Sequence, residues 1–312
     1  MPMDWSAAGT PLVATRAVHF AATAIVAGDV VFRTVIAAPV VHPEVPGAAL
    51  QLTRTLRVAW FSLGVAVISG GIWLMLQAAS MSGMPLDEAL TADILSTVIN
   101  ETQFGQVTTV RAGLAICLMV CLVYDRVAIA RWLGLAAALA VAASLAWSGH
   151  AGSTIGETGY LHLAADALHL MAAAAWIGGL ASLVLFLRAA SRGKAVSLAS
   201  DVVGRFSIMG LVCVAALLLT GIINAAILVG SVHALVVTEY GRLLLLKLVL
   251  FTFMLMLALI NRLVLTPRLA PSGNGALPWL TRNSTIELAL GLAILAVVGV
   301  LGTMHPAIHL AN

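Results

Sequence analysis

Charged residues are scarce in this chain of 312 residues. Asp, Glu, Lys and Arg together make up 9% of it, while 61% of the residues are hydrophobic. An average soluble domain is roughly 25% charged. This balance excludes a soluble globular protein and indicates an integral membrane protein. The 16 basic residues are spread along the chain rather than clustered, so nucleic acid is not an expected partner.

Cysteine is equally rare. Cys117, Cys121 and Cys213 all lie inside apolar runs and suggest no disulfide framework. Nucleotide-binding motifs and hydrolytic constellations are also missing, so we expect neither an enzyme nor a nucleotide partner. The first apolar run follows Asp4 without a basic segment or a clear cleavage site, and we therefore expect it to be a transmembrane helix rather than a secretory signal.

Long apolar runs are abundant. A helix needs about 20 apolar residues to cross a bilayer, and eight stretches qualify. They are 13–38, 55–79, 106–124, 131–148, 164–187, 203–229, 241–264 and 284–303. The segment at about 80–103 contains Pro85 and four acids, and it is too polar to span. The sequence therefore predicts an all-α membrane protein with eight transmembrane helices and one outer loop that holds a short amphipathic helix.

Basic residues predict the orientation of these helices. One side of the membrane would hold Arg33, Arg54, Arg57, Arg126, Arg131, Arg188, Arg192, Lys194, Arg205, Arg262, Arg268 and Arg282. The other side would hold Arg16, Arg111, Arg242 and Lys247. By the positive-inside rule the first side is cytoplasmic, and both termini are outside.

Histidines gather on the predicted outer side. They are His19, His150, His162, His169, His233, His305 and His309, whereas His42 is inside. The outer side also collects the thioethers of Met1, Met3, Met81, Met84 and Met304. Imidazole and thioether are ligand types that suit copper. We therefore expect copper as the bound metal, in an oxidation state that the sequence leaves open.

The fifth apolar run carries the densest group of these candidates. His162, Asp166 and His169 are spaced by four and then three residues, so they share one face of a helix with Ala173 and Trp176. In a membrane, such groups need partners, because burying an unpaired polar group costs several kcal/mol. Asp166 would orient an imidazole or favour cation entry. The alternative is a polar helix end wetted at the interface.

The two halves of the chain, 1–150 and 151–312, look like copies of one four-helix unit. His19 and His169 each precede a glycine, Gly28 and Gly178, by nine residues. Other pairs are Arg54 and Gly70 with Arg205 and Gly221 at an offset of 151, and Thr102, Phe104, Gly105 and Arg111 with Thr238, Tyr240, Gly241 and Lys247 at an offset of 136. Related by an axis along the membrane normal, the copies would bring His19 and His169 face to face, flanked by His150 and His305, in one outer vestibule.

Several motifs together resemble the CopD family of bacterial copper-resistance membrane proteins. They are Trp147-Ser148-Gly149-His150, Asp166-Ala167-Leu168-His169 with Trp176-Ile177-Gly178-Gly179, Tyr240-Gly241-Arg242 with Lys247, Asn261-Arg262 with Thr266-Pro267, and Gly302-Thr303-Met304-His305-Pro306. The resemblance is close from the fourth span onward. It implies an inner-membrane protein that moves copper from the periplasm to the cytoplasm, beside or fused to a periplasmic CopC protein. No CopC-like segment is visible here, so a separate partner is expected.

The expected metal ligands are therefore His19, His150, His169 and His305, supplemented by His162, His309, Met304, Met81 and Met84. The supporting polar residues are Asp166, Tyr240, Arg242, Lys247 and Glu287. Lys247 would pair with Glu287 or Glu239, or bind an anion or a lipid headgroup.

Two other functions remain open. Facing histidines on bundle helices also hold b-type haem, which would make this an electron-transfer protein. Alternatively, the protein would handle copper for a periplasmic partner without transporting it.

Overall fold

The structure is a computed structural model, and it describes residues 9–40, 48–191, 196–269 and 275–309. Within these ranges eight helices are long and apolar enough to cross a membrane, which confirms the predicted number. The spans are Gly9–Ala37, Thr53–Ser82, Gln103–Val123, Ala128–Ser148, Gly156–Ala190, Leu198–Leu228, Glu239–Leu269 and Ala276–Leu301. The fifth and eighth begin eight residues earlier than predicted, because each helix starts with turns that contain polar residues, such as Glu157 in the fifth and Arg282 and Asn283 in the eighth.

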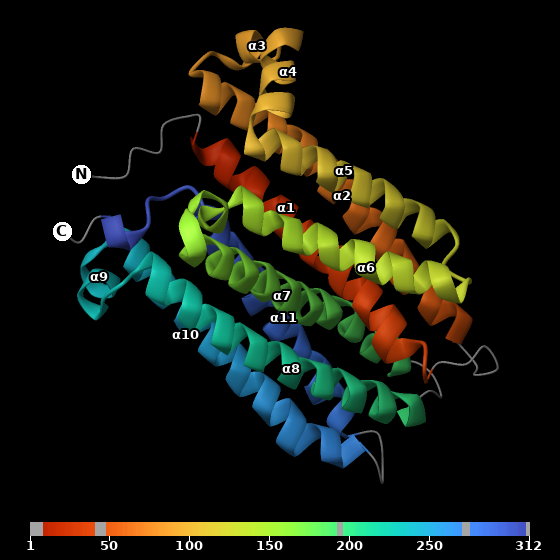
Figure 1. Cartoon of the computed structure of the whole chain (residues 1–312). Coiled ribbons are helices and arrows are strands. Elements are labelled where there is room, and N and C mark those ends of the chain that lie inside the picture. The colour runs from red at the N-terminus through yellow and green to blue at the C-terminus, as the bar shows by residue number, and fades with distance from the viewer. Residues whose placement is uncertain (1–8, 41–47, 192–195, 270–274, 310–312) are drawn as a thin grey trace.

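The helices lie side by side in one bundle (Figure 1). They are α1 (Gly9–Val31), α2 (Ala48–Ser82), α3 (Leu86–Ala89), α4 (Ala92–Glu101), α5 (Gln103–Val123), α6 (Ala128–Ser144), α7 (Gly156–Ala190), α8 (Val196–Leu228), α9 (Val232–Val237), α10 (Glu239–Ile260) and α11 (Ala276–Leu301). We call the end of the bundle at which α1 begins and α11 ends the terminal end. Short helices α3, α4 and α9 lie at this end (Figure 1).

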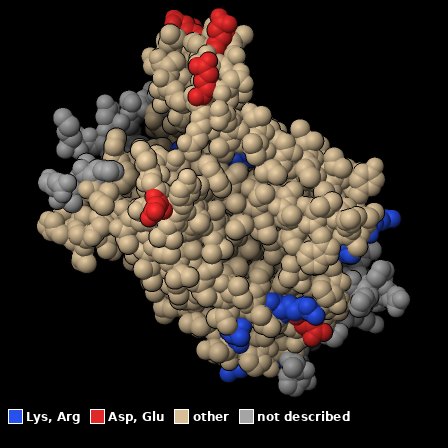
Figure 2. All heavy atoms as spheres, viewed as in Figure 1, with Lys and Arg blue, Asp and Glu red and all other residues tan. Residues whose placement is uncertain are grey.

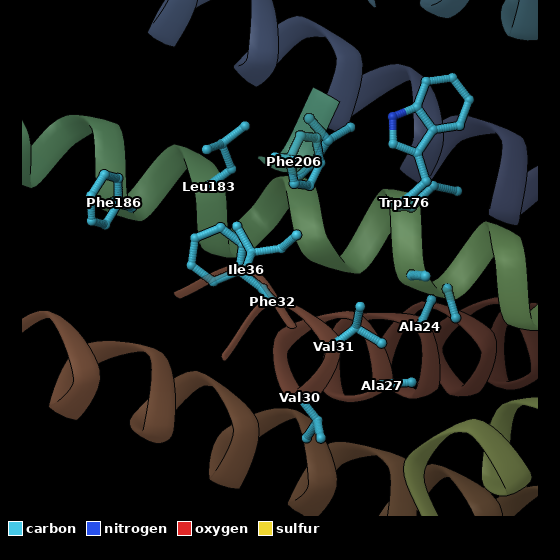
Figure 3. Packing of buried hydrophobic residues seen from close by; sticks show 14 of the residues in the cluster. Ala24, Ala27, Val30, Val31, Phe32, Ile36, Trp176, Leu183, Phe186 and Phe206 are labelled. Atoms are coloured by element: carbon cyan, nitrogen blue, oxygen red, sulfur yellow. The ribbon is translucent and has the colours of Figure 1, made fainter. Parts of the chain in front are cut away.

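Helices α1 and α7 are the most deeply buried spans and form the centre of the bundle. They cross where Gly28 meets Gly178, with no room for a side chain. A Cβ on Gly28 would lie 2.3 Å from the Gly179 nitrogen, and one on Gly178 would lie 1.9 Å from the Ala24 oxygen. Small residues permit such close approach of membrane helices. Figure 3 shows Ala24 of α1 between α1 and α7 in this core.

The two ends of the bundle carry different charges. Acidic side chains cluster over α3 and α4, whereas Lys and Arg side chains gather at the opposite end (Figure 2). The exposed acids of the terminal end are Asp87, Glu88, Asp93, Glu101, Glu157 and Glu239. Below the opposite surface, Arg33 pairs with Asp125 and also donates to Thr55. This ion pair fastens α5 to the turn that ends the first span.

Candidate functional site

A cavity of about 360 Å³ opens in the terminal half of the bundle, between α1, α7, α8, α10 and α11. Most of its wall is apolar. Its titratable and amide side chains are Arg16, His150, His162, Asp166, His169, Asn224, Tyr240 and Lys247. Six of these eight were predicted as site residues, and they come from segments far apart in the sequence. Ligand sites in proteins are commonly apolar cavities of about this size that hold a few polar groups.

The predicted stripe on α7 lines this cavity. His162, Asp166 and His169 belong to its wall together with Ala173 and Trp176, as their helical spacing requires. The polar face therefore lies inside the protein rather than at a wetted helix end.

Hydrogen bonds fix the protonation of the His169 ring. The hydroxyl of Thr220 donates to the Ala216 oxygen at 2.6 Å, so its oxygen accepts from Nδ1 of His169 at 2.9 Å. A neutral imidazole with its proton on Nδ1 keeps a lone pair on Nε2, which is the form that binds metals. The ring of His169 therefore presents an unprotonated nitrogen away from Thr220.

His162 has the same arrangement. Thr154 donates to the His150 oxygen at 3.1 Å and accepts from His162 Nδ1 at 2.8 Å. His162 and His169 are seven residues apart, or about 10.5 Å along the axis of α7.

Asp166 lies between these histidines on α7. Its carboxylate accepts a hydrogen bond from Nδ2 of Asn224 at 3.1 Å and interacts electrostatically with Lys247. The expected partners of Lys247 were wrong: Glu287 accepts from Asn261 near the opposite end of α10, and Glu239 is exposed. Sequence reasoning missed Asp166 as the counter-charge because it lies 81 positions away in the chain.

His150 enters the cavity from the 3-10 turn His150–Ser153. Its Nε2 donates to the Leu301 oxygen at 3.2 Å, and its ring lies edge-on to Tyr240 with the centroids 6.0 Å apart. The segment that follows α6 is thereby joined to the start of α10 and the end of α11.

His19 does not face His169, contrary to the sequence prediction. Its Nδ1 donates to the Ala66 oxygen at 3.0 Å and lies 3.2 Å from Ser69 Oγ, both on α2. The ring is 3% exposed and packs edge-on against Trp73, with the centroids 5.4 Å apart. The single vestibule with four imidazoles was therefore wrong, because α1 and α7 turn their histidines toward different neighbouring helices.

The other predicted ligands lie outside the cavity. His305, Met81 and Met84 are exposed at the terminal end, and Met304 is half-buried beside the cluster that contains Tyr240. Arg242 is exposed, with Nε donating to the Val236 oxygen at 3.2 Å. The side chain of His309 lies outside the described residues, as does His42. Among the described side chains, no three His, Cys, Asp or Glu residues converge into a metal-binding group.

Sequence reasoning missed three parts of the site. Thr154 and Thr220 orient the imidazoles, and Arg16 contributes a cation to the cavity wall. A signal existed for Thr220, because it precedes Gly221 as Ser69 precedes Gly70 in the matching segment. Nothing in the sequence distinguished Arg16 from a basic residue that simply lies near the end of a helix.

Comparison with known proteins identifies the family. The family profile for the N-terminal domain of copper resistance protein D-like proteins matches residues 4–160, and the profile for copper resistance protein D matches residues 200–301. The chain is 32% identical to copper resistance protein D of Pseudomonas syringae pv. tomato over 270 residues, which cover 83% of this chain and 86% of that protein. The chain belongs to the copper resistance protein D family.

Two further relatives differ in how much of their own length this chain covers. The inner membrane protein YebZ of Escherichia coli is 31% identical over 94% of this chain and 98% of its own length. The copper transport protein CutJ of Bacillus subtilis is 28% identical over 95% of this chain but only 53% of its own length. No solved structure gives a significant match. The predicted family is confirmed, and the chain is a helical membrane protein of the copper resistance and transport group.

Proposed function

We propose that this protein binds copper in the cavity and passes it across a bacterial inner membrane from the periplasm toward the cytoplasm. The observation that carries the proposal is that His150, His162, Asp166 and His169 all line one cavity. The names of the Pseudomonas and Bacillus relatives, a copper resistance and a copper transport protein, support the choice of copper as cargo.

His169 and Asp166 form the centre of the proposed copper site. They are three residues apart on α7, so they are neighbours on the face that lines the cavity. His169 offers an unprotonated Nε2, and the carboxylate offers a negative charge that favours a cation. His162 and His150 would receive the ion nearer the terminal end. Tyr240 and Lys247 would line the α10 side of the site. The positive charge of Lys247 would balance the negative charge of Asp166.

The proposal includes an entry surface at the terminal end. Exposed Met81 and Met84, half-buried Met304 and exposed His305 offer soft and borderline ligands there. With 10 of the 14 basic residues that the structure describes lying toward the opposite end, the positive-inside rule favours a periplasmic terminal end and periplasmic termini. A separate CopC-like protein would then deliver copper to this surface.

We also propose that residues 1–150 and 151–312 are two copies of one unit. Matching local contacts support this. Thr102 and Thr238 cap α5 and α10 in the same way, each accepting from the amide of a glycine three residues on at 3.0 Å. His19 and His169 each place Nδ1 against a hydroxyl that precedes a glycine.

A b-type haem is the second candidate, and the cavity itself favours it. A mostly apolar space of about 360 Å³ with an unprotonated imidazole nitrogen is also a setting in which proteins hold haem. Buried cations on its wall would suit the carboxylates of such a ligand. One experiment separates the two candidates.

The test is metal content and visible absorbance of the detergent-purified protein, before and after copper loading, for wild type and His169→Ala. Stoichiometric copper that is lost in His169→Ala, without a Soret band, is the expected result. His233→Ala, which changes an exposed histidine outside the cavity, is the matched control and should bind copper normally. A Soret band that disappears in His169→Ala would overturn copper in favour of haem.

Flux measurements in vesicles complete the test. Vesicles that contain the wild-type protein should accumulate copper faster than vesicles that contain His169→Ala. Bound copper with no flux difference would contradict transport and favour a protein that handles copper for a periplasmic partner.

A further inference from the structure

Arg16 is a buried cation without a counter-charge. Its side chain is 5% exposed, and its guanidinium carbon lies 4.9 Å from the Trp73 ring and 5.8 Å from the Phe20 ring. Its Nε has no hydrogen-bond partner. The one ion pair within 4.0 Å among the described residues joins Arg33 to Asp125, far from this point. A buried charge left in this state costs several kcal/mol.

A second arginine, Arg111, packs on the same Trp73 indole but differs from Arg16 in its hydrogen bonds. The guanidinium carbon of Arg111 lies 5.6 Å from the Trp73 ring. Its nitrogens donate to Ser144 Oγ at 3.0 Å, the Ser144 oxygen at 3.2 Å and Ser148 Oγ at 2.9 Å. Arg111 is therefore satisfied by its surroundings. It also repels Arg16 and adds to the positive charge that surrounds it.

Arg16 belongs to the wall of the cavity, next to the turn that follows α11. Its Nη2 fills the space beside Gly302, where a Cβ would lie only 2.1 Å away. On the cavity wall the formal charges are Arg16 and Lys247 against Asp166, which leaves an excess of one positive charge. The carboxylate of Asp166 is already engaged by Asn224 and Lys247, so it does not neutralise Arg16.

From this geometry we propose that the cavity binds an organic anion whose oxyanion head, a carboxylate or a phosphate, pairs with Arg16. A planar guanidinium matches two oxygens of such a group. The neighbouring wall is apolar, with Phe20, Leu145 and Val298, and suits an apolar body on the anion. The proposal does not depend on copper being the cargo. A bound anion would also offset the repulsion that a metal cation meets on approaching this wall.

The anion could come from the bilayer, as a lipid, or from water, as a small organic acid. Thermal unfolding of the detergent-purified protein at fixed ionic strength distinguishes these sources when acetate, decanoate and phosphate are added separately. A ligand that binds the folded state raises Tm in a saturable way. Saturation with decanoate alone indicates a lipid-like anion, and saturation with acetate or phosphate indicates a water-borne one.

The variants isolate Arg16. Arg16→Gln should weaken the apparent anion affinity at least tenfold, and Arg16→Lys, which keeps the charge without the planar fork, should weaken it less. Gly302→Ala should act like Arg16→Gln, because the new methyl group displaces the guanidinium. The controls are Arg205→Gln, an exposed arginine outside the cavity, and Gly71→Ala, where a Cβ meets nothing within 4 Å.

Mass spectrometry of the purified protein tests for an anion that is already bound when the protein is isolated. An anionic lipid or acid that accompanies wild type and Arg205→Gln, but not Arg16→Gln, would support the proposal directly. Equal Tm shifts in wild type and Arg16→Gln would overturn it. So would the absence of both a saturable shift and a co-purified anion.

Discussion

The surroundings of His19 and His169 differ more than the histidines themselves. Each ring donates from Nδ1 to the neighbouring helix, α2 for His19 and α8 for His169, and each leaves Nε2 unprotonated. Beside His19 stands Trp73, which is 1% exposed. At the offset of 151 the matching position is Asn224. Where the indole fills space in the first half, the smaller amide leaves a cavity in the second.

The neighbouring positions follow the same division. In the first half Arg16, Phe104 and Arg111 all pack on Trp73. In the proposed pairing of the two halves their counterparts are Asp166, Tyr240 and Lys247, and all three line the cavity. If the two halves are copies of one unit, as we propose, the aromatic cluster around Trp73 and the polar wall of the cavity occupy corresponding places, and Arg16 belongs to both. We therefore expect access, rather than the presence of a histidine, to decide which half can hold a ligand.

Filling the cavity gives the largest expected effect. Asn224→Trp places in the second half the residue that closes the first, and it should abolish copper binding and flux while the protein still folds. The measurement is copper per protein together with Tm. Leu219→Trp adds the same bulk to an exposed position of α8 and should bind copper normally. Full copper binding by Asn224→Trp would contradict the role of the cavity.

Removing the indole of the closed half should destabilise the fold. Trp73→Ala deletes a fully buried ring, and changes of this kind cost about 3–5 kcal/mol. Thermal or denaturant unfolding in detergent measures the loss. Trp132→Ala, which removes a ring that is 60% exposed, is the control and should cost much less. Similar losses in the two variants would show that the aromatic cluster does not hold the first half together.

The two histidines should respond oppositely to truncation. His169→Ala should weaken copper binding more than a hundredfold, or about 2.8 kcal/mol. His19→Ala should leave copper affinity unchanged and lower Tm instead, because its ring lies outside the cavity in a packed site. Equilibrium competition with a copper chelator gives the affinities. A comparable loss of affinity in both variants would mean that both halves bind metal.

The hydroxyls that orient the rings should give the smallest effect. Thr220→Val removes the acceptor of the His169 Nδ1 proton and should reduce copper affinity about tenfold, as loss of partners behind a metal ligand does. Ser69→Ala makes the corresponding change beside His19 and should leave the affinity unchanged. The same chelator competition applies. Equal affinities for Thr220→Val and wild type would show that the hydroxyl does not prepare His169.

Much of the fold was visible in the sequence, and less of the site. Continuous apolar runs predict spans directly, and helical periodicity placed His162, Asp166 and His169 on one face. The direction in which His19 points was not accessible, because it depends on how α1 and α2 rotate against each other. Nor could composition show that Trp73 and Asn224 occupy matching positions with opposite consequences. Periodicity gives the face of a helix, and packing decides what that face meets.

The most direct test is the location of copper itself. A crystal of the copper-loaded protein, with an anomalous difference map at the copper edge, would show it without a variant. The account predicts a peak within ligand distance of His169 Nε2, inside the cavity and beside Asp166. A peak at Met81 and Met84, at His305 or beside His19, with none in the cavity, would contradict it.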